Sequence, residues 1–435
     1  MPNAILSSLD GYDGPVLIER IAFLLKADLD IPAESKRECA IRGLQHLLEL
    51  GCTTSPHWNL FCSYAGGEAQ QKSTVNRQIK ANEVQRKVLE QKYSEALHEL
   101  DSRQITRSNF FSHTEQRLRI LLLSRDYKSV IAVKSYIDSG DENAEILGED
   151  ELGARDRVHL LIVFAYFLEG AFLDCCVAFF GYLAENRNLL DTICDSRFTS
   201  FISRDEMLLA IAISCLVVTP MDRYEGFMFS HDAQQLLRLN PLLFECLELL
   251  RSVRFREFFK IWNGTINLKC RSSPFLDQTW EISHSIMRSK VLFLYTKLAS
   301  RVPLVYLSRI LGVDEELVRE DIRRLVELEG LNLEIKGDIL VNTRRDPLSN
   351  VVRILEKNGK AIQARSGALR VQNLELSDYK QGLILSTDDA MMCTVHVGKH
   401  DFNSRAGIGT HVGNVDIYNE DLGVDPETLE FDEED

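Results

Sequence analysis

The sequence predicts a mostly α-helical protein, in which an array of helical repeats is followed by a winged helix and a long terminal helix. The main observation is a motif in which an aromatic residue is followed, at the third and fourth positions after it, by two small or apolar residues. Positions i, i+3 and i+4 share one helix face, so each copy indicates the second helix of an antiparallel pair whose apolar face needs a neighbour. Such pairs stack into a solenoid. The motif occurs four times, at Tyr93-Ala96-Leu97, Tyr127-Val130-Ile131, Phe172-Cys175-Cys176 and Phe255-Phe258-Phe259.

Length and composition favour several units that bury a core. At 435 residues the chain exceeds what one hydrophobic core supports, and 45% of its residues are hydrophobic. Its ten cysteines lack the spacing of a metal site or a disulfide framework, which indicates a reducing compartment. The first ten residues lack the features of a secretory signal, and residues 160–184 contain two acids and a turn, so no membrane span is expected.

Amphipathic patterns predict the helices in order along the chain. Residues 16–27 and 35–50 form the first two, with Ser35 as a helix cap, and the polar residues 65–80 form a loop. A charged helix over residues 81–100 leads into the repeats, which an acidic, glycine-containing connection interrupts at residues 140–155. Further helices are predicted after the repeats, at residues 204–218, 232–237, 241–251, 253–263 and 278–300.

Residues 302–342 have the pattern of a winged helix. A helix, a tight turn at Gly312 and a second helix over residues 314–329 precede a hairpin of two short strands around Lys336-Gly337-Asp338. Many winged helices bind nucleic acid, but this second helix carries seven acids against three bases, so phosphate would repel it. The alternative of nucleic-acid binding needs a basic stripe, for which the candidates are Arg319, Arg323, Arg324, Arg344, Arg345 and Arg353.

Two segments are candidate partner-binding surfaces. In the first strand of the wing, Leu331, Leu333 and Ile335 alternate with polar residues, so one face is apolar while the strand edge offers unpaired backbone groups to a neighbouring subunit. Beyond Pro347, residues 348–376 form a long helix with little left to pack on in its own chain, and we expect it to bundle with other chains. Its candidate contact residues are Ile354, Leu355, Ile362 and Leu369.

The chain ends in an acidic segment. Residues 419–435 contain nine acids and no base, and the whole chain has a net charge of −15. This composition is typical of a disordered, solvating tail. The alternative is a field that steers a basic partner, although salt at 0.1 M screens it beyond about 10 Å.

Four segments together carry a resemblance to a known family: residues 198–206 (FTSFISRDE), 242–250 (LLFECLELL), 286–295 (IMRSKVLFLY), and 339–341 with 344–346. Their order resembles the PCI domain of scaffold subunits in the proteasome lid, the COP-nine signalosome and translation initiation factor three. The likeness is closest to signalosome subunit one, with its proteasome-lid paralogue as the runner-up, and covers about residues 15–376. Residues 381–435 have no counterpart in that pattern.

The resemblance implies a TPR-like helical-repeat solenoid followed by a PCI domain. It also implies a non-catalytic scaffold subunit of the COP-nine signalosome, which removes the ubiquitin-like modifier from cullins and so regulates cullin-RING ubiquitin ligases. The implied partners are other PCI subunits, metalloprotease-type subunits and cullin-RING ligases, in a hetero-oligomer of the cytoplasm and nucleus, without nucleic acid or membrane. The alternatives are a proteasome-lid PCI subunit, or a PCI protein that binds nucleic acid or initiation factor three. The implied divisions are an N-terminal helical region and loop (1–80), TPR-like repeats (81–215), a PCI helical subdomain (216–300), a winged helix (301–346), a bundle helix (347–380) and a flexible acidic tail (381–435).

No catalytic or cofactor site is predicted. The sequence contains neither a phosphate-binding glycine loop nor the elbow of a serine nucleophile. One loose cluster of possible metal ligands lacks the paired-histidine motif of the metalloprotease-type subunits, so we expect an incidental polar loop. That cluster consists of Cys393, His396, His400 and His411, with Asp401 adjacent.

Overall fold

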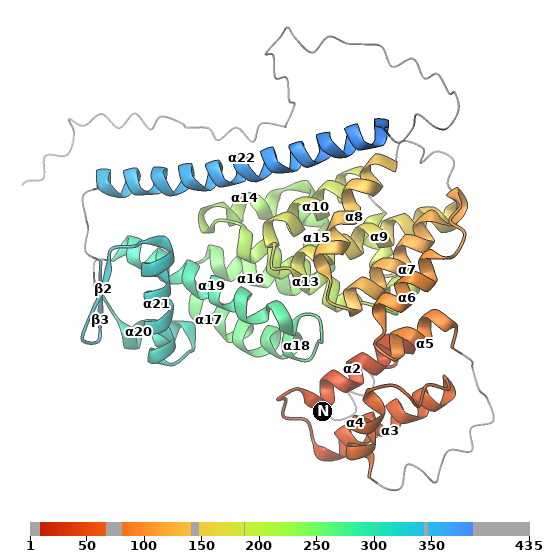
Figure 1. Ribbon diagram of the computed structural model, residues 1–435. Helices are drawn as coiled ribbons and strands as arrows, with labels where there is room; N and C mark the ends of the chain where they lie inside the picture. Colours follow the sequence, from red (N-terminus) through yellow and green to blue (C-terminus); the bar gives the residue numbers. More distant parts are fainter. Residues whose placement is uncertain are drawn as a thin grey trace, which may run out of the picture. The chain divides into compact units, whose positions relative to one another are not determined.

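The computed structural model describes residues 9–66, 81–140, 148–186, 188–299, 301–342 and 347–385 (Figure 1). Contacts divide the chain into two units, Met1–Asp346 and Pro347–Asp435. The first unit holds the helical array and the winged helix, and the second holds the long helix α22 (Pro347–Leu385). The predicted mostly α-helical architecture is confirmed, while the domain boundaries inside the first unit stay predictions. The predicted tail lies outside the described residues, except for 381–385, which belong to α22.

Three helices near the N-terminus pack around a core of their own. The Asp13 side chain caps α2 (Gly14–Lys26) by accepting from a backbone N–H of its first turn. α3 (Ala33–Glu49) begins earlier than expected, so the prediction that Ser35 caps it is wrong: this residue lies inside the helix and is buried. α4 (His57–Ala65), which was not predicted, completes this group.

Each of the four motif copies starts the second helix of a hairpin, as predicted, and its aromatic residue is the first residue of that helix. In the first hairpin the chain turns between Leu89 and Tyr93. The prediction of a single helix over residues 81–100 is therefore wrong. The pairs are α5 (Glu83–Leu89) with α6 (Tyr93–Asp101), α7 (Phe110–Leu123) with α8 (Tyr127–Gly140), α9 (Glu149–Leu168) with α10 (Phe172–Glu185), and α16 (Pro241–Arg251) with α17 (Phe255–Ile261).

The same turn joins all four pairs. The N–H groups of two successive turn residues donate back into the preceding helix, as Gly170 does to Phe167 O and Ala171 to Tyr166 O, both at 2.9 Å. This geometry requires a positive φ at the first of the two residues and therefore favours glycine. Three of the four turns nevertheless hold a residue with a side chain there: the φ values are 60° at Gln91, 63° at Arg125, 78° at Gly170 and 58° at Val253.

One continuous core fills the helical array. α9 and α13 (Arg204–Val218) lie within it, and every residue from Glu206 to Val217 is buried. α10 packs against both, so residues 160–184 are parts of two core helices joined by a turn. None of the described helices is by itself long and apolar enough to cross a membrane; the bent pair Arg204–Val218 and Met221–Phe229 passes on length and composition alone.

Shorter elements complete the first unit. The helices predicted over residues 204–218 and 241–251 are confirmed at both ends, and the others of that series are confirmed with shifted ends. The remaining helices are α11 (Leu189–Thr192), α12 (Ser196–Thr199), α14 (Tyr224–Phe229), α15 (His231–Leu239), α18 (Asn267–Arg271) and α19 (Asp277–Leu298), with 3-10 turns at Arg107–Asn109 and Met221–Arg223 and a π-helical turn at Trp262–Ile266.

Residues 301–342 fold as the predicted winged helix. Gly312, at a φ of 64°, makes the tight turn between its two helices. The sheet is antiparallel in the order β1-β3-β2. The β2–β3 hairpin was predicted and β1 was not, because three residues ahead of a helix show no alternation. The elements are β1 (Arg301–Pro303), α20 (Leu304–Leu311), α21 (Glu315–Glu329), β2 (Leu333–Lys336) and β3 (Ile339–Asn342).

Candidate partner-binding surfaces

The outer edge of strand β2 is the first candidate surface. β2 pairs with β3 on one side, in the register Ile335↔Leu340, and no strand among the described residues pairs with its other side. Lys336 and Ile339 flank the two-residue turn, and such a flanking pair exchanges two backbone hydrogen bonds. Hydrogen-bonded and non-hydrogen-bonded pairs then alternate along the strands, so the backbone groups of Leu333 and Ile335 point away from β3. The Leu333 N–H donates to Leu331 O at 3.0 Å. The Leu333 C=O and both backbone groups of Ile335 are left at the edge, where an added strand would pair.

The wing side chains that were predicted to bind a partner face the core of the winged helix. Leu333 is only 8% exposed, and Leu331 and Ile335 are half-buried against the same core. This strand therefore offers a second chain its backbone edge rather than its apolar side chains. Partner binding at the wing stays a prediction.

Arg319 of α21 fixes the tip of the wing. Its guanidinium donates to Gly337 O at 3.1 Å and to Asp338 Oδ1 at 2.8 Å. The Leu304 N–H, at the start of α20, donates to Asp338 O at 2.8 Å. The turn between β2 and β3 is thus tied to both helices of the winged helix. An edge held in this way loses little conformational freedom when a partner binds.

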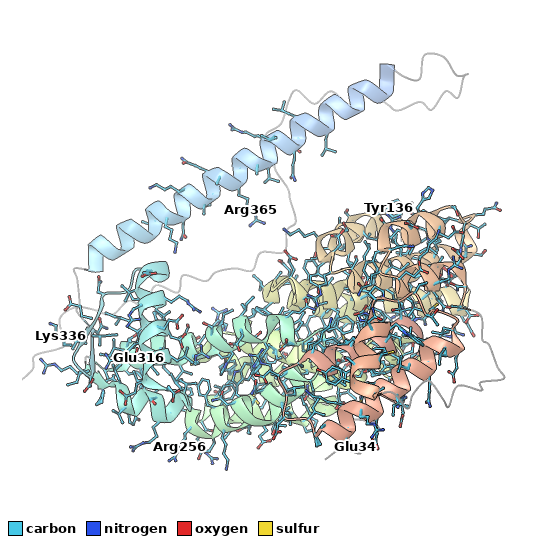
Figure 2. The ribbon with its side chains drawn as sticks, turned by 60° about the horizontal axis from the view of Figure 1, so that its bottom comes forward. Glu34, Tyr136, Arg256, Glu316, Lys336 and Arg365 are labelled. Atoms are coloured by element: carbon cyan, nitrogen blue, oxygen red, sulfur yellow. The ribbon has the colours of Figure 1, made fainter. Side chains whose placement is uncertain are left out.

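The outer face of α21 is acidic. Arg319 is hydrogen-bonded to the tip of the wing, and Arg324 donates to Glu320 Oε1 at 3.2 Å on the same helix. Arg323 is exposed one turn from Glu320, and Glu316 projects into solvent nearby (Figure 2). The described part of this surface therefore forms no basic stripe, which disfavours the nucleic-acid alternative. The structure does not describe the side chains of the other three candidates, Arg344, Arg345 and Arg353.

A buried polar chain attaches the winged helix to the helical array. The Arg288 guanidinium of α19 donates to both carboxylate oxygens of Asp321 on α21, at 2.6 and 3.2 Å, and the two side chains are 4% and 1% exposed. Arg288 also donates to His284 Nδ1 at 2.9 Å, so His284 donates from Nε2 to Asn263 Oδ1 at 2.8 Å. Asn263 donates in turn to Leu311 O at 2.9 Å. Burial, with the neighbouring guanidinium, lowers the pKa of His284 to about 4, so the ring is neutral at pH 7.

Helix α22 presents the second candidate surface, a ladder of large apolar side chains that are exposed to solvent. Leu355, Ile362 and Leu369, three of the predicted contact residues, are 64%, 68% and 53% exposed. Leu376 continues the row at 60%. The side chain of the fourth predicted residue, Ile354, is not among those described. Such a row on a chain that otherwise buries its apolar residues marks a surface for another helix.

The ladder follows a seven-residue repeat, close to two turns of an α-helix, that extends beyond the predicted contact residues in both directions. A strict period of seven keeps one narrow seam facing a partner while two helices supercoil around each other. The row on α22 is therefore suited to contact with another helix. The signal in the sequence is the constant spacing of leucine or isoleucine, at Leu348, Leu355, Ile362, Leu369, Leu376 and Leu383.

A second buried ion pair, also not predicted, ties the N-terminal helices to the array. Arg20 of α2 donates to both carboxylate oxygens of Glu206 on α13, at 2.7 and 2.6 Å. Glu206 also accepts from the Ser203 N–H at 2.9 Å, in a capping box, and from the Ser273 hydroxyl. Burial opposes ionisation, but the Arg20 charge and these hydrogen bonds outweigh it and lower the pKa of Glu206. The capping box is visible in the sequence, whereas the partner 186 residues away is not.

The described residues show no sign of a catalytic centre. In these ranges, no three histidine, cysteine, aspartate or glutamate side chains come together to hold a metal ion. Burial raises the pKa of the Cys246 thiol to about 12, which keeps it protonated and unreactive. A cavity of about 40 Å³ next to Arg20 and Gln278 suits a water molecule rather than a substrate. Outside the described residues lie Cys393, His396, His400, Asp401 and His411.

Two family models match the chain in succession. The CSN11 N-terminal domain matches residues 8–284, and the CSN11 C-terminal domain matches residues 301–417. The chain is 29% identical over 400 residues to the Cop9 signalosome complex subunit 11 of Saccharomyces cerevisiae, a match that covers 86% of this chain and 89% of that protein. It is 25% identical over 421 residues to the COP9 signalosome complex subunit 11 of Candida glabrata, covering 89% of this chain and 92% of that protein. The COP9 signalosome complex subunit 11 of Eremothecium gossypii is 26% identical over 388 residues, covering 86% of this chain and 91% of that protein.

The resemblance to PCI subunits of the signalosome is confirmed, but the finer likeness to subunit one is wrong, because the matching families and relatives are those of subunit 11. The segments that suggested subunit one supply core positions: Leu243, Leu247, Met287 and Val291 are all buried. Packing constrains such positions in every protein of this architecture, so they do not separate one paralogue from another. The CSN11 C-terminal domain extends to residue 417, so it includes part of residues 381–435, for which the subunit-one pattern offered no counterpart. The chain belongs to the CSN11 family.

Proposed function

We propose that this chain is a non-catalytic scaffold subunit of a COP9 signalosome in the cytoplasm and nucleus. It would help to organise the complex that removes the ubiquitin-like modifier from cullins, together with other PCI subunits, metalloprotease-type subunits and cullin-RING ligases. Its relatives are named as subunits of that complex, which favours the signalosome over the proteasome lid or initiation factor three. The observation that carries the proposal is the exposed ladder of α22, because a chain acting alone has no use for it.

The two candidate surfaces would contribute in different ways. Each ladder residue that a partner buries contributes roughly 1.5–3 kcal/mol before the costs of association are subtracted. Each backbone hydrogen bond at the edge of β2 contributes only about 0.5–1.5 kcal/mol net, but it fixes the register of the added strand. We infer that the ladder supplies most of the affinity and that the edge sets the arrangement of neighbouring subunits.

Capture of partners by the full-length chain tests the ladder. Ile362→Glu places a charge in the seam, so we expect it to abolish co-purification of signalosome subunits while leaving thermal unfolding unchanged. Ala364→Glu is the matched control, because it adds the same charge on the opposite side of the same helix. Undiminished capture by the Ile362 variant would contradict the proposal.

The edge of β2 has its own matched pair of variants. Ile335→Pro removes an N–H that points away from β3, so it keeps the ladder with β3 and costs only the packing of its half-buried side chain, while we expect weaker association with a neighbouring subunit. Glu334→Pro removes an N–H that points toward β3, so it should destabilise the winged helix itself. If the Ile335 variant folds and still captures every partner, edge pairing is wrong.

The scaffold role also predicts what the purified chain does not do. Incubated alone with a modified cullin, it should release no modifier, with or without added zinc. Metal-dependent release by the isolated chain, unaffected by removal of trace contaminating subunits, would show that it is an enzyme.

A further inference from the structure

Helix α22 is basic within an acidic chain. The whole chain has a net charge of −15, whereas residues 347–374 contain five bases and one acid, a net of +4. Arg365 stands three residues after Ile362 and four before Leu369, and this helical spacing places it on the face of the ladder. This surface therefore fits a ligand that is both apolar and acidic. The bases whose side chains are described, all of them exposed, are Lys357, Lys360, Arg365 and Arg370.

One segment of the chain has the matching chemistry. Residues 419–435 contain nine acids and no base, so their net charge is −9. They lie outside the described residues and beyond residue 417, where the match to the CSN11 C-terminal domain ends, so they are a feature of this chain rather than of the matched domain. Opposite charge attracts the segment to α22. Among its acids stand four apolar residues that the ladder would accommodate, Leu422, Val424, Leu429 and Phe431.

The covalent connection allows this segment to reach its own helix. Residues 386–418, 33 in number, separate the two, and an extended chain of that length spans up to about 110 Å. α22 has 39 residues, which corresponds to a length of about 58 Å. The whole ladder is therefore within reach, and the tether raises the effective concentration of the segment at the helix.

We propose that residues 419–435 bind the ladder face of α22 in the free chain and cover it until a partner helix displaces them. Acids of the segment pair with Arg365 and Arg370, and its apolar residues cover the ladder. A second copy of α22 fits this face less well, because it brings two positively charged helices together. Covering of the ladder concerns this chain alone; only the displacement step rests on the proposed function.

Hydrogen–deuterium exchange of the full-length chain and of a chain that ends at residue 418 tests the proposal. At low salt, we expect the amides of residues 355–376 to exchange about tenfold faster without the segment, which corresponds to about 1.4 kcal/mol of protection. A synthetic peptide of residues 419–435 should restore the protection in the shortened chain, and high salt should remove it. Equal exchange in the two chains at low salt would overturn the proposal.

Variants separate the contributions of charge and apolar contact. In the full-length chain, Arg365→Gln with Arg370→Gln should reproduce the faster exchange, whereas Lys336→Gln, which removes an exposed charge on the wing, should not (Figure 2). A peptide with serine in place of its four apolar residues should protect poorly. If the Arg variant exchanged as slowly as the unchanged chain, the pairing with α22 would be wrong.

Other occupants of the ladder give different results. Protection of the shortened chain that rises with its own concentration would assign the ladder to a second copy and overturn the proposal. Protection of the full-length chain that appears only after other subunits are added would assign it to a partner and overturn it as well. If the full-length chain captures no signalosome subunit but still differs in exchange from the shortened chain, the proposed function fails and this inference stands.

Discussion

The winged helix and α22 contain the same kinds of apolar residue and use them in opposite ways. In the winged helix, Val302, Leu333 and Leu340 are 5%, 8% and 2% exposed. In α22, Leu355 and Ile362 are 64% and 68% exposed. Composition therefore does not separate the residues that hold this chain together from those that would hold it to another chain. The two groups differ in how much of each side chain is exposed to solvent in the folded chain.

Charged residues divide in the same way. Arg288 and Asp321 are buried against each other between α19 and α21, so loss of either one leaves a charge without a partner inside the protein. Arg365 and Arg370 of α22 have exposed side chains, so their loss leaves no buried charge without a partner. Substitutions in the two regions should therefore change different measured quantities.

Breaking the buried ion pair should have the largest effect on stability. Asp321→Ala leaves the Arg288 guanidinium buried without its counter-charge, and we expect the free energy of unfolding to fall by about 3–5 kcal/mol. Urea unfolding followed by circular dichroism measures the change. Glu327→Ala, at an exposed acid of the same helix, should change stability by less than about 0.5 kcal/mol. Equal effects of the two substitutions would remove the distinction between buried and exposed charge that the comparison makes.

Two identical truncations test the comparison directly. Leu333→Ala should destabilise the protein by about 2–5 kcal/mol, because it leaves a cavity in the winged-helix core. Leu369→Ala removes the same atoms from an exposed site, so it should change the free energy of unfolding by less than about 0.5 kcal/mol but weaken co-purification of partners. Urea unfolding and pull-down from cells provide the two measurements. If Leu369→Ala destabilises the isolated chain as much as Leu333→Ala does, Leu369 is a core residue and the contrast between the two regions is wrong.

Acid should loosen the winged helix and leave the binding ladder chemically unchanged. The folded-state pKa of His284, about 4, lies below its ordinary value of 6.5, so on acidification the unfolded chain takes up the proton first. The contribution of this residue is complete above pH 6.5 and is lost as the pH falls through 4, by at most roughly 3 kcal/mol. Stability measured from pH 7 to 4 should fall less steeply in His284→Gln. The same slope in both proteins would mean that other groups cause the acid sensitivity.

Local sequence patterns predicted the helical repeats, but they did not predict every hairpin turn or the ion pair between distant helices. The aromatic residue and its two followers lie within one helical turn, so the motif marks the start of a helix such as that at Phe172 without any long-range information. The turn before it is signalled by Gly170, but glutamine at the equivalent position, Gln91, carries no such signal. The Arg20–Glu206 pair joins residues 186 apart, and no local pattern relates them.

The candidate surfaces were only partly predictable, for a different reason. Alternation at Leu331, Leu333 and Ile335 shows that one face of the strand is apolar, but not whether its own domain or another chain covers that face. The structure shows that its own domain covers it. For α22, Ile362 and Leu369 are exposed among the described residues, but neither the sequence pattern nor this exposure shows which segment or partner contacts them.

Val253 is as exposed as the ladder residues, but its position in the fold gives no reason to assign it to a binding surface. It is 58% exposed, close to the ladder residues of α22, but it lies in a hairpin turn of the array with a φ of 58°. A residue with a side chain in this left-handed conformation is strained by roughly 1–2 kcal/mol. Gly170 occupies the equivalent position in another turn without that strain.

Val253→Gly should therefore raise the free energy of unfolding by about 1 kcal/mol, once the greater freedom of glycine in the unfolded chain is subtracted. Thermal unfolding would show a higher Tm, and co-purification of partners should not change. Gly170→Val is the converse control and should lower the Tm. If Val253→Gly instead weakens co-purification, the strained turn presents its valine to a partner, and the helical array has an interaction surface of its own beside those of β2 and α22.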